Sequence, residues 1–238
     1  MSAAGWRSLV HALVVDRGRV LLVPSDEGWA VPAVELDGDA EDDLREAVRG
    51  LEERLGTPAT ILRYADRVVH RDERLLELAY VLERPNELPE LPGAAWVASS
   101  ELSGIELARP AHAELLEREL RDSGQPAPAR RAPWGRTGWL TQAGEWIEAS
   151  LAALGRPVTG RIEQLRVWCL SCLLRVPTGE GAVFFKATAA SPLFVDEGSV
   201  MRGLARFFPG SVPEPLAIDA SRRWMLLDDL LAFETGST

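Results

Sequence analysis

The sequence is poor in cysteine, has no long hydrophobic run and carries no excess of basic charge. Only two of its 238 residues are cysteine, which excludes a disulfide-stabilised scaffold and is typical of a reducing compartment. No apolar run reaches the roughly 18–20 residues of a transmembrane helix, and charged residues interrupt the stretch from Leu9 to Val23, so it is no signal peptide. The formal net charge of −10 argues against nonspecific binding to nucleic acid or to an anionic membrane. We therefore expect a cytoplasmic protein without nucleic-acid or membrane partners.

What is present is the composition of folded domains, with 46% hydrophobic and 26% charged residues. The length fits one large or two small domains. Between Arg121 and Arg136, prolines and glycines replace any periodic pattern, which is typical of a linker. The sequence thus predicts one domain at 1–121, a linker at 122–133 and a second domain at 134–238.

The first half alternates strand and helix signals in the order β-β-α-β-β-α. The turn signal Asp16-Arg17-Gly18 predicts a hairpin, and Gly56 stands where a helix C-cap belongs. Apolar spacing predicts helices at about 39–55 and over Ala111–Arg121. Extended segments are expected at Leu9–Val15, Arg19–Val23, Trp29–Pro32, Ile61–His70, Leu75–Leu82 and Ala94–Ala98. This order predicts an α+β fold with helices set against a sheet.

The second half also mixes helices and strands. Thr141 is a candidate N-cap for a helix that Gly155 closes, and a second helix is expected from about Phe194 to Phe208. The expected strands are Gln164–Cys169, Cys172–Val176, Ala182–Ala187, Pro215–Ile218 and Arg223–Leu227. The Cys169-x-x-Cys172 pair lies in this strand context without a second cysteine pair, which favours two packed residues over a zinc or redox site.

A frame placed on Gly56 aligns several residues of the first helix with a known motif. Arg49, Leu51, Glu53 and Gly56 match it, and Glu41 falls on its upstream glutamate. In this the first half resembles the Nudix hydrolases, whose box reads G-x5-E-x7-R-E-U-x-E-E-x-G-U, with U apolar. In that family, glutamates one helical turn apart hold divalent cations against a diphosphate, and the metal activates water. The resemblance implies a Nudix-like α/β/α sandwich.

The box is degenerate at several positions. Gly50 and Arg54 replace two of its glutamates, Glu35 stands at its first glycine, and Thr57 stands at its last apolar position. An arginine at a metal position repels Mg²⁺, and no shifted frame restores the set. We therefore expect no metal here and a solvated acidic helix face formed by Glu41, Glu46, Glu52 and Glu53.

The second half contains a strand that ends in lysine, followed by a glutamate on the next helix. Lys186 closes the run Val-Phe-Phe-Lys, and Glu197 follows eleven residues later, with Asp196 as the alternative partner. Residues 161–231 resemble the N-lobe of the aminoglycoside phosphotransferase family, a kinase-like fold. The resemblance implies that Lys186 reaches the phosphates of ATP, that Glu197 positions it, that Ser171 touches a phosphate, and that Mg²⁺ takes part.

The residues of a kinase C-lobe are missing. The only histidines, His11, His70 and His112, lie in the first half, so no His-x-Asp-x-x-x-x-Asn loop follows Glu197. The chain stops just past the expected hinge at Asp228, which suggests a truncated or frameshifted product. An N-lobe alone exposes an apolar face, so a partner or oligomer is expected to cover it.

The sequence therefore favours a phosphotransferase-family protein with an ATP-binding N-lobe that is catalytically incomplete, and whose catalytic residues are unknown. One alternative is Nudix-type hydrolysis of nucleoside-diphosphate-linked compounds by the first domain. The other is a non-catalytic Nudix-like ligand-binding module. The substrate in each case is a small molecule or a nucleotide.

Overall fold

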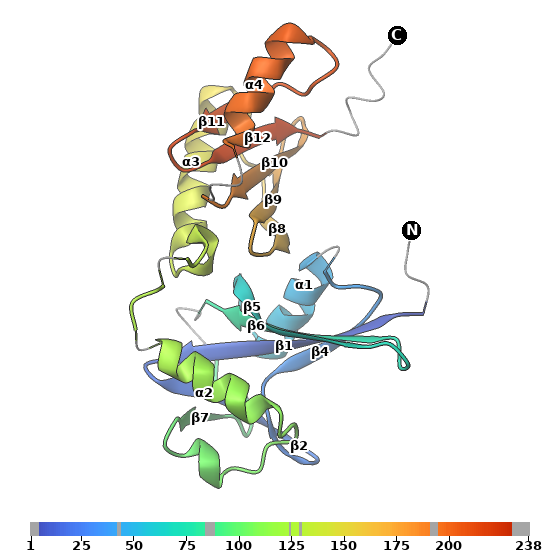
Figure 1. The fold of residues 1–238 in the computed structure, drawn as a ribbon, viewed down its shortest axis with the longest axis vertical. Helices are drawn as coiled ribbons and strands as arrows, with labels where there is room; N and C mark the ends of the chain where they lie inside the picture. Colours follow the sequence, from blue (N-terminus) through green and yellow to red (C-terminus); the bar gives the residue numbers. More distant parts are fainter. Residues whose placement is uncertain are drawn as a thin grey trace. The chain divides into compact units, whose positions relative to one another are not determined.

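The computed structural model describes residues 5–41, 44–83, 89–123, 125–128, 130–190 and 195–229. The chain divides into two compact units, Met1–Arg131 and Ala132–Thr238, each with its own sheet (Figure 1). The predicted α+β class is confirmed, because sheets and helices occur together in both units. Among the described residues, no helix has the length and hydrophobicity needed to cross a membrane.

The first unit is built around β1, which pairs in parallel with β6 and antiparallel with β4 and β2. The sheet order is β3-β2-β1-β6-β5, with β4 and β7 attached to β1 and β2. Its strands are β1 (Arg7–Asp16), β2 (Arg19–Ser25), β3 (Gly28–Ala30), β4 (Ala33–Asp37), β5 (Ile61–His70), β6 (Leu75–Leu82) and β7 (Ala95–Ala98). The predicted bounds of β5 and β6 match the observed ones.

Two helices cover this sheet, one on each face. Helix α1 (Leu44–Leu55) contacts β4, where Gly50 lies against Val34. Helix α2 (His112–Ser123) places Leu115, Leu116 and Leu120 in a cluster with Leu13, Ala79 and Val81 of the sheet. Val34 pairs with Val10, and since side chains alternate along a strand, Val10 and Leu13 face opposite sides. A short 3-10 turn, Leu102–Gly104, precedes α2.

Two expectations at helix ends differ from the structure. Helix α1 begins at Leu44, later than the predicted start near residue 39, and residues 42–43 lie outside the described part of the chain. Thr141 lies inside its helix and is not the N-cap, because Gly138, with φ 78°, precedes the first helical residue. A residue without Cβ reaches this left-handed conformation at little cost, so the chain turns into the helix three residues earlier than predicted.

The second unit is a five-stranded antiparallel sheet in the order β11-β12-β10-β9-β8. Its elements are α3 (Trp139–Ala153), β8 (Glu163–Val167), β9 (Ser171–Thr178), β10 (Gly181–Thr188), α4 (Glu197–Phe207), β11 (Ala217–Asp219) and β12 (Trp224–Asp228), after a 3-10 turn at Pro133–Gly135. Its core is aromatic, with edge-to-face or tilted contacts among Trp139, Trp146, Phe185 and Trp224. Phe194, the predicted helix start, lies outside the described residues.

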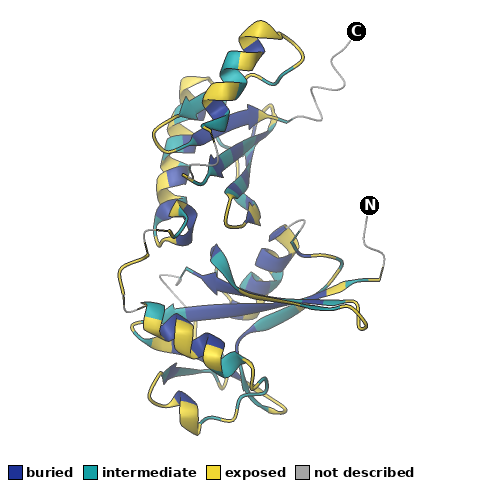
Figure 2. Cartoon of the chain, viewed as in Figure 1, coloured by how far each residue is buried: buried dark blue, intermediate teal, exposed yellow. Residues whose placement is uncertain are grey.

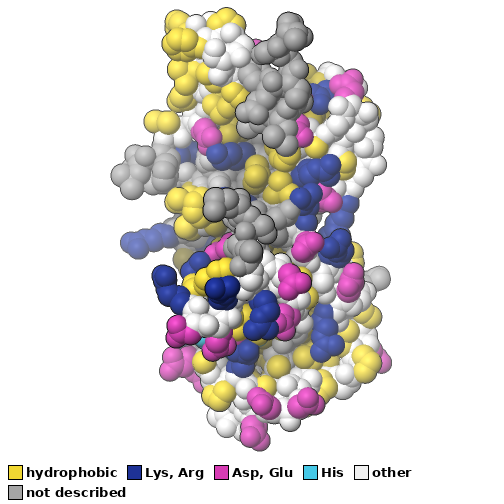
Figure 3. All heavy atoms as spheres, turned by 90° about the vertical axis from the view of Figure 1, so that its right-hand side faces the viewer, with side chains coloured by type: hydrophobic (Ala, Val, Ile, Leu, Met, Phe, Trp, Pro, Cys, Tyr) yellow, Lys and Arg dark blue, Asp and Glu magenta, His cyan; other side chains and the backbone are white. Residues whose placement is uncertain are grey.

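Burial follows the strands of both sheets, whereas α4 keeps exposed hydrophobic side chains (Figure 2). These are Val200, Leu204 and Phe207, with Phe208 directly after the helix. In the space-filling view, hydrophobic side chains gather near the top of the second unit, where α4 lies, and acidic and basic side chains mix over the first unit (Figure 3). Among the described residues, α4 and the residue after it thus carry four of the nine exposed large hydrophobic side chains.

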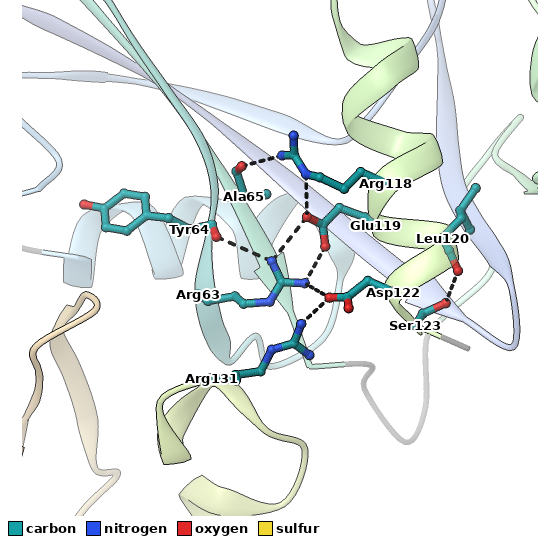
Figure 4. A network of polar contacts seen from close by, with 9 residues as sticks. All are labelled: Arg63, Tyr64, Ala65, Arg118, Glu119, Leu120, Asp122, Ser123 and Arg131. Atoms are coloured by element: carbon teal, nitrogen blue, oxygen red, sulfur yellow. Dashed lines mark hydrogen bonds and ion pairs between the residues drawn. The ribbon is translucent and has the colours of Figure 1, made fainter. Parts of the chain in front are cut away.

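A network of ion pairs fastens α2 to β5 (Figure 4). Glu119 is almost fully buried and binds Arg63 of β5 through both carboxylate oxygens, while Asp122 accepts a further bond from Arg63 at 3.2 Å. Arg131 also binds Asp122, which ties the end of the first unit to α2. A buried carboxylate needs such partners, so this network fixes how α2 lies on the sheet.

Candidate functional site

The structure brings together the two residues that the kinase-like resemblance singled out. Lys186 Nζ donates to Glu197 Oε1 at 2.7 Å, joining the third strand of the second unit to the first turn of α4. In the middle of the sheet, Lys186 pairs with Leu173 of β9 on one side and with Met225 of β12 on the other. The ion pair keeps 30% and 39% of the two side chains exposed, so solvent and small anions can reach the ammonium group.

Ser171 and Asp196 each form a hydrogen bond close to their own place in the chain. The indole of Trp168 donates to Ser171 Oγ at 2.7 Å, inside the turn between β8 and β9. A second indole also holds this turn, because Trp134 Nε1 donates to the carbonyl of Trp168 at 2.8 Å. Asp196 binds the hydroxyl of Ser199 at the start of α4, so Glu197 is the carboxylate that meets Lys186.

In the first unit, the charged box residues Arg49 and Glu53 of α1 are exposed, whereas Leu51 is buried. Arg49 and Glu46 form an exposed pair at 3.5 Å, and Glu53 is exposed. Glu52 accepts a hydrogen bond from the amide of Ala59 at 2.9 Å, so it closes the loop after the helix. Gly56, with φ 66°, ends the helix in the left-handed conformation, as predicted from its position.

Glu41 lies apart from the other box residues and is held by the sheet. Arg67 of β5 meets its carboxylate side-on with three contacts of 2.7–2.9 Å from Nε and Nη2. The hydroxyl of Tyr64 donates to Glu41 Oε1 at 2.8 Å, and the Tyr64 ring stacks on Tyr80 with ring centres 4.7 Å apart. These hydrogen bonds raise the pKa of Arg67, and burial raises the pKa of Tyr64. Arg67 therefore stays positively charged, and the hydroxyl of Tyr64 keeps its proton.

A β-bulge explains why Tyr64 and Arg67 reach the same carboxylate. In a regular strand, residues three apart face opposite sides of the sheet. Here the register shifts between Tyr64 and Asp66, so that Tyr64 lies opposite Tyr80 and Arg67 lies opposite Leu78. Tyr80 and Leu78 are two residues apart on β6 and share a face. The extra residue thus turns Arg67 towards the α1 side of the sheet.

The residues at the degenerate box do not fit a divalent metal. A Cβ added to Gly50, which replaces a box glutamate, would lie 2.7 Å from a Val34 methyl group, so the helix packs too closely on β4 for a side chain there. Glu41 already holds a guanidinium where a cation would bind. Among the described residues, no group of three or more His, Cys, Asp or Glu is arranged to hold a metal ion.

Two features of these sites were missed from the sequence alone. Arg67 and Tyr64 were placed only as part of a strand, because the bulge that turns them to Glu41 has no clear sequence signal. The second feature is the composition itself, which was not used: Lys186 is the only lysine in the chain, and all other basic residues except histidine are arginine. A lysine kept at one position in such a sequence suggests a specific role for its ammonium group.

Comparison with known proteins gives a likeness of fold for about half of the chain. A Nudix hydrolase from Nitrosomonas europaea has 15% identity and a TM-score of 0.39 over 52% of this chain and 76% of that one. An ADP-ribose pyrophosphatase from Streptococcus suis has 15% identity and a TM-score of 0.37, over 48% of this chain and 92% of that one. The MutT protein of Methanosarcina mazei has 17% identity and a TM-score of 0.36, over 52% of this chain and 100% of that one. At TM-scores below 0.5, this likeness assigns neither a family nor an activity to the chain.

The other comparisons found nothing. No protein-family model matches the chain, and no curated protein matches it. The resemblance of the second unit to aminoglycoside phosphotransferases therefore stays a prediction based on its own residues.

Proposed function

We propose that the first unit is a Nudix-like module that binds a nucleoside-diphosphate-linked compound without a metal ion and without cleaving it. The observation that carries this proposal is the side-on contact between Arg67 and Glu41. The resemblance puts Glu41 at a glutamate of the metal-binding box, so this contact would fill a metal position with a guanidinium. An arginine fixed in this way offers positive charge to a diphosphate but activates no water.

The surroundings of Arg67 support binding by charge. Its side chain is 48% exposed although three contacts orient it, so a ligand can approach a guanidinium that is already in place. Arg49 on α1 is also exposed and forms a 3.5 Å contact with Glu46. One planar guanidinium can bind two phosphate oxygens at once, so a diphosphate is the favoured class of ligand.

Calorimetric titration of the full chain with ADP-ribose tests this proposal. We expect the same affinity in Mg²⁺ and in EDTA, and at least a tenfold weaker affinity in Arg67→Gln. Arg7→Gln is the matched control, because Arg7 forms an exposed pair with Glu35 elsewhere on the sheet and should leave the affinity unchanged. Binding that disappears in EDTA, or equal losses in both variants, would contradict the proposal.

A second candidate function is favoured by a separate observation, the 2.7 Å contact between Lys186 and Glu197. We propose that the second unit binds the phosphates of ATP through Lys186, with Glu197 as its positioning residue. A lysine on the third strand paired with a glutamate of the following helix is the arrangement that kinases use for this purpose. The chain has no histidine-containing catalytic loop after Glu197, so this proposal concerns binding and not phosphate transfer.

The single lysine makes this second function easy to test. An acyl-phosphate derivative of ATP transfers its acyl group to an amine beside the bound phosphates, and Lys186 is the only side-chain amine available. We expect acylation of Lys186, measured by peptide mass spectrometry, and its suppression by excess ATP. Acylation that excess ATP does not reduce, or none at all, would overturn the second proposal and leave the first one standing.

A further inference from the structure

The three histidines of the chain gather on the face of the first sheet that α2 covers, and two of them contact the carboxylate of Glu77. His70 Nε2 lies 3.0 Å from Glu77 Oε2, and His11 Nε2 lies 3.6 Å from Glu77 Oε1. Arg109 forms an ion pair with the same carboxylate. His112, the first residue of α2, meets the ring of His11 edge-on, with ring centres 4.7 Å apart. We call these five residues the histidine cluster.

The register of the sheet explains why residues so distant in sequence meet. Glu77 of β6 lies opposite Leu9 of β1, which places it diagonally across from His11 on the same face. His70 ends β5 beside the same part of β6, since Val68 pairs with Glu77. The backbone amide of His112 donates to the carbonyl of Arg109 at 2.9 Å, so the cluster includes the turn that starts α2.

His11 is the least satisfied member of the cluster. Its side chain is 95% buried, being 5% exposed, and neither ring nitrogen has a hydrogen-bond partner within the described residues. Burial, together with the nearby His112 and Arg109, lowers the pKa of His11 to about 4, and burial also lowers the pKa of His112. Both rings are therefore neutral at pH 7, and their edge-on contact packs α2 on β1.

Protonation changes the charge balance of this cluster. The charged and titratable groups around His11 are Glu77 from β6, Arg109 from the turn and His112 from α2. Asp66 of β5 acts on His112, His70 of β5 contacts Glu77, and Glu35 of β4 is paired with Arg7. With both rings neutral, the carboxylate of Glu77 balances Arg109. Protons on His11 and His112 add two positive charges 4.7 Å apart next to that arginine.

We propose that the histidine cluster is an acid-sensitive latch, which holds the start of α2 on the sheet and releases it when His11 and His112 take up protons. This inference is independent of both proposed binding functions. It concerns residues 109–114 and not the ion-pair network at the other end of α2, where Glu119 is held by Arg63.

The direction of the pH effect follows from the lowered pKa values. The ordinary value for histidine is 6.5 and the folded value for His11 is about 4, so the unfolded or released state binds the proton more readily. The stability that His11 contributes is complete above pH 6.5 and is lost as the pH falls towards 4. Glu77 acts in the same direction, because its own pKa is lowered and its contribution is also lost in acid.

Nuclear magnetic resonance of the full chain can follow this latch directly. With three histidines in the sequence, the ring Cε1–H spectrum reports on the cluster alone. Between pH 7.5 and 4, we expect the His11 signal to titrate below pH 5.5 and the amides of residues 109–114 to shift with the same midpoint. His11→Phe keeps an aromatic edge against His112 but removes the proton site, and its amides should not show that transition.

Two further variants keep the test decisive. His70→Gln removes the most exposed ring and leaves the His11–His112 contact, so it should retain the transition. If His11→Phe does not fold, His112→Phe should raise the His11 midpoint by removing a nearby positive charge. Amides 109–114 that shift equally in the wild-type chain and His11→Phe, or a His11 midpoint unmoved by His112→Phe, would overturn the proposal.

Discussion

The two units both place a basic side chain of a strand against a carboxylate, but they do so with different chemistry. In the first unit, β5 supplies two arginines: Arg63 holds the buried Glu119, and Arg67 holds Glu41 side-on. In the second unit, the only lysine of the chain makes one contact with Glu197. A guanidinium with paired bonds fixes a carboxylate in place, whereas an ammonium with one contact can exchange it for a phosphate oxygen.

The exposure of each pair, rather than the kind of cation, separates residues that hold the fold from residues that a ligand can reach. The side chain of Glu119 is 4% exposed and that of Glu197 is 39% exposed, so the free-energy cost of losing the partner differs between them. A buried charge without its partner is strongly destabilising, whereas an exposed pair contributes little to stability. Mutations of these pairs therefore have effects on different measured quantities.

Arg63→Met is expected to have the largest effect on stability. It leaves Glu119 buried beside the guanidinium of Arg118, which lies 3.6 Å away, and should lower the free energy of unfolding by about 3 kcal/mol. Arg67→Met, on the same strand, is the matched control and should cost about 1 kcal/mol, because Glu41 is partly hydrated. Urea denaturation of both variants measures this difference. Equal losses of unfolding free energy would contradict the proposed difference between the buried and the exposed ion pair.

Gly50→Glu restores a box glutamate and should be next in size. The close approach of Val34 to this position means that any side chain forces α1 and β4 apart, at about 2 kcal/mol. Removing the obstructing methyl groups in the double variant with Val34→Ala should recover part of that loss. If Gly50→Glu alone is neutral in thermal unfolding and gains Mg²⁺-dependent hydrolysis, the helix face is closer to a metal site than the packing indicates.

Lys186→Met should act on binding and hardly on folding. We expect ATP affinity to fall at least tenfold, about 1.4 kcal/mol, while the unfolding free energy changes by less than about 0.5 kcal/mol. Lys186→Arg keeps the charge but not the compact ammonium group, so its ATP affinity should lie between those of the wild-type chain and Lys186→Met. Fluorescence titration with a labelled ATP analogue measures the affinities, and an unaltered affinity in Lys186→Met would contradict the role of this lysine.

Glu53→Gln is expected to have the smallest effect. Its side chain lies on the exposed face of α1, so the free energy of unfolding should change by less than about 0.5 kcal/mol. The affinity for ADP-ribose should also stay the same, because the proposed site uses Arg67 and no metal. An affinity that depends on Glu53 only in the presence of Mg²⁺ would restore the box to a functional role.

The sequence predicts the elements well where periodicity is strong and fails where the backbone departs from it. Strands β5 and β6 match their predicted bounds, since both are long and alternate clearly. The bulge at Tyr64 and Asp66 could not be predicted, because an unpaired residue in a strand leaves no mark in the pattern. The contact of Lys186 with Glu197 followed from order along the chain, whereas the contact of His11 with Glu77 depends on the parallel pairing of β1 with β6, two strands distant in the sequence.

The measurement that tests the central claim most directly is phosphorus nuclear magnetic resonance of ADP-ribose with the full chain and Mg²⁺. The account predicts that the two diphosphate signals shift or broaden on binding and remain for hours without monophosphate signals. It also predicts the same shifts in EDTA and their loss in Arg67→Gln. Monophosphate signals that grow only with Mg²⁺ and disappear in Glu53→Gln would contradict the account and show a working hydrolase.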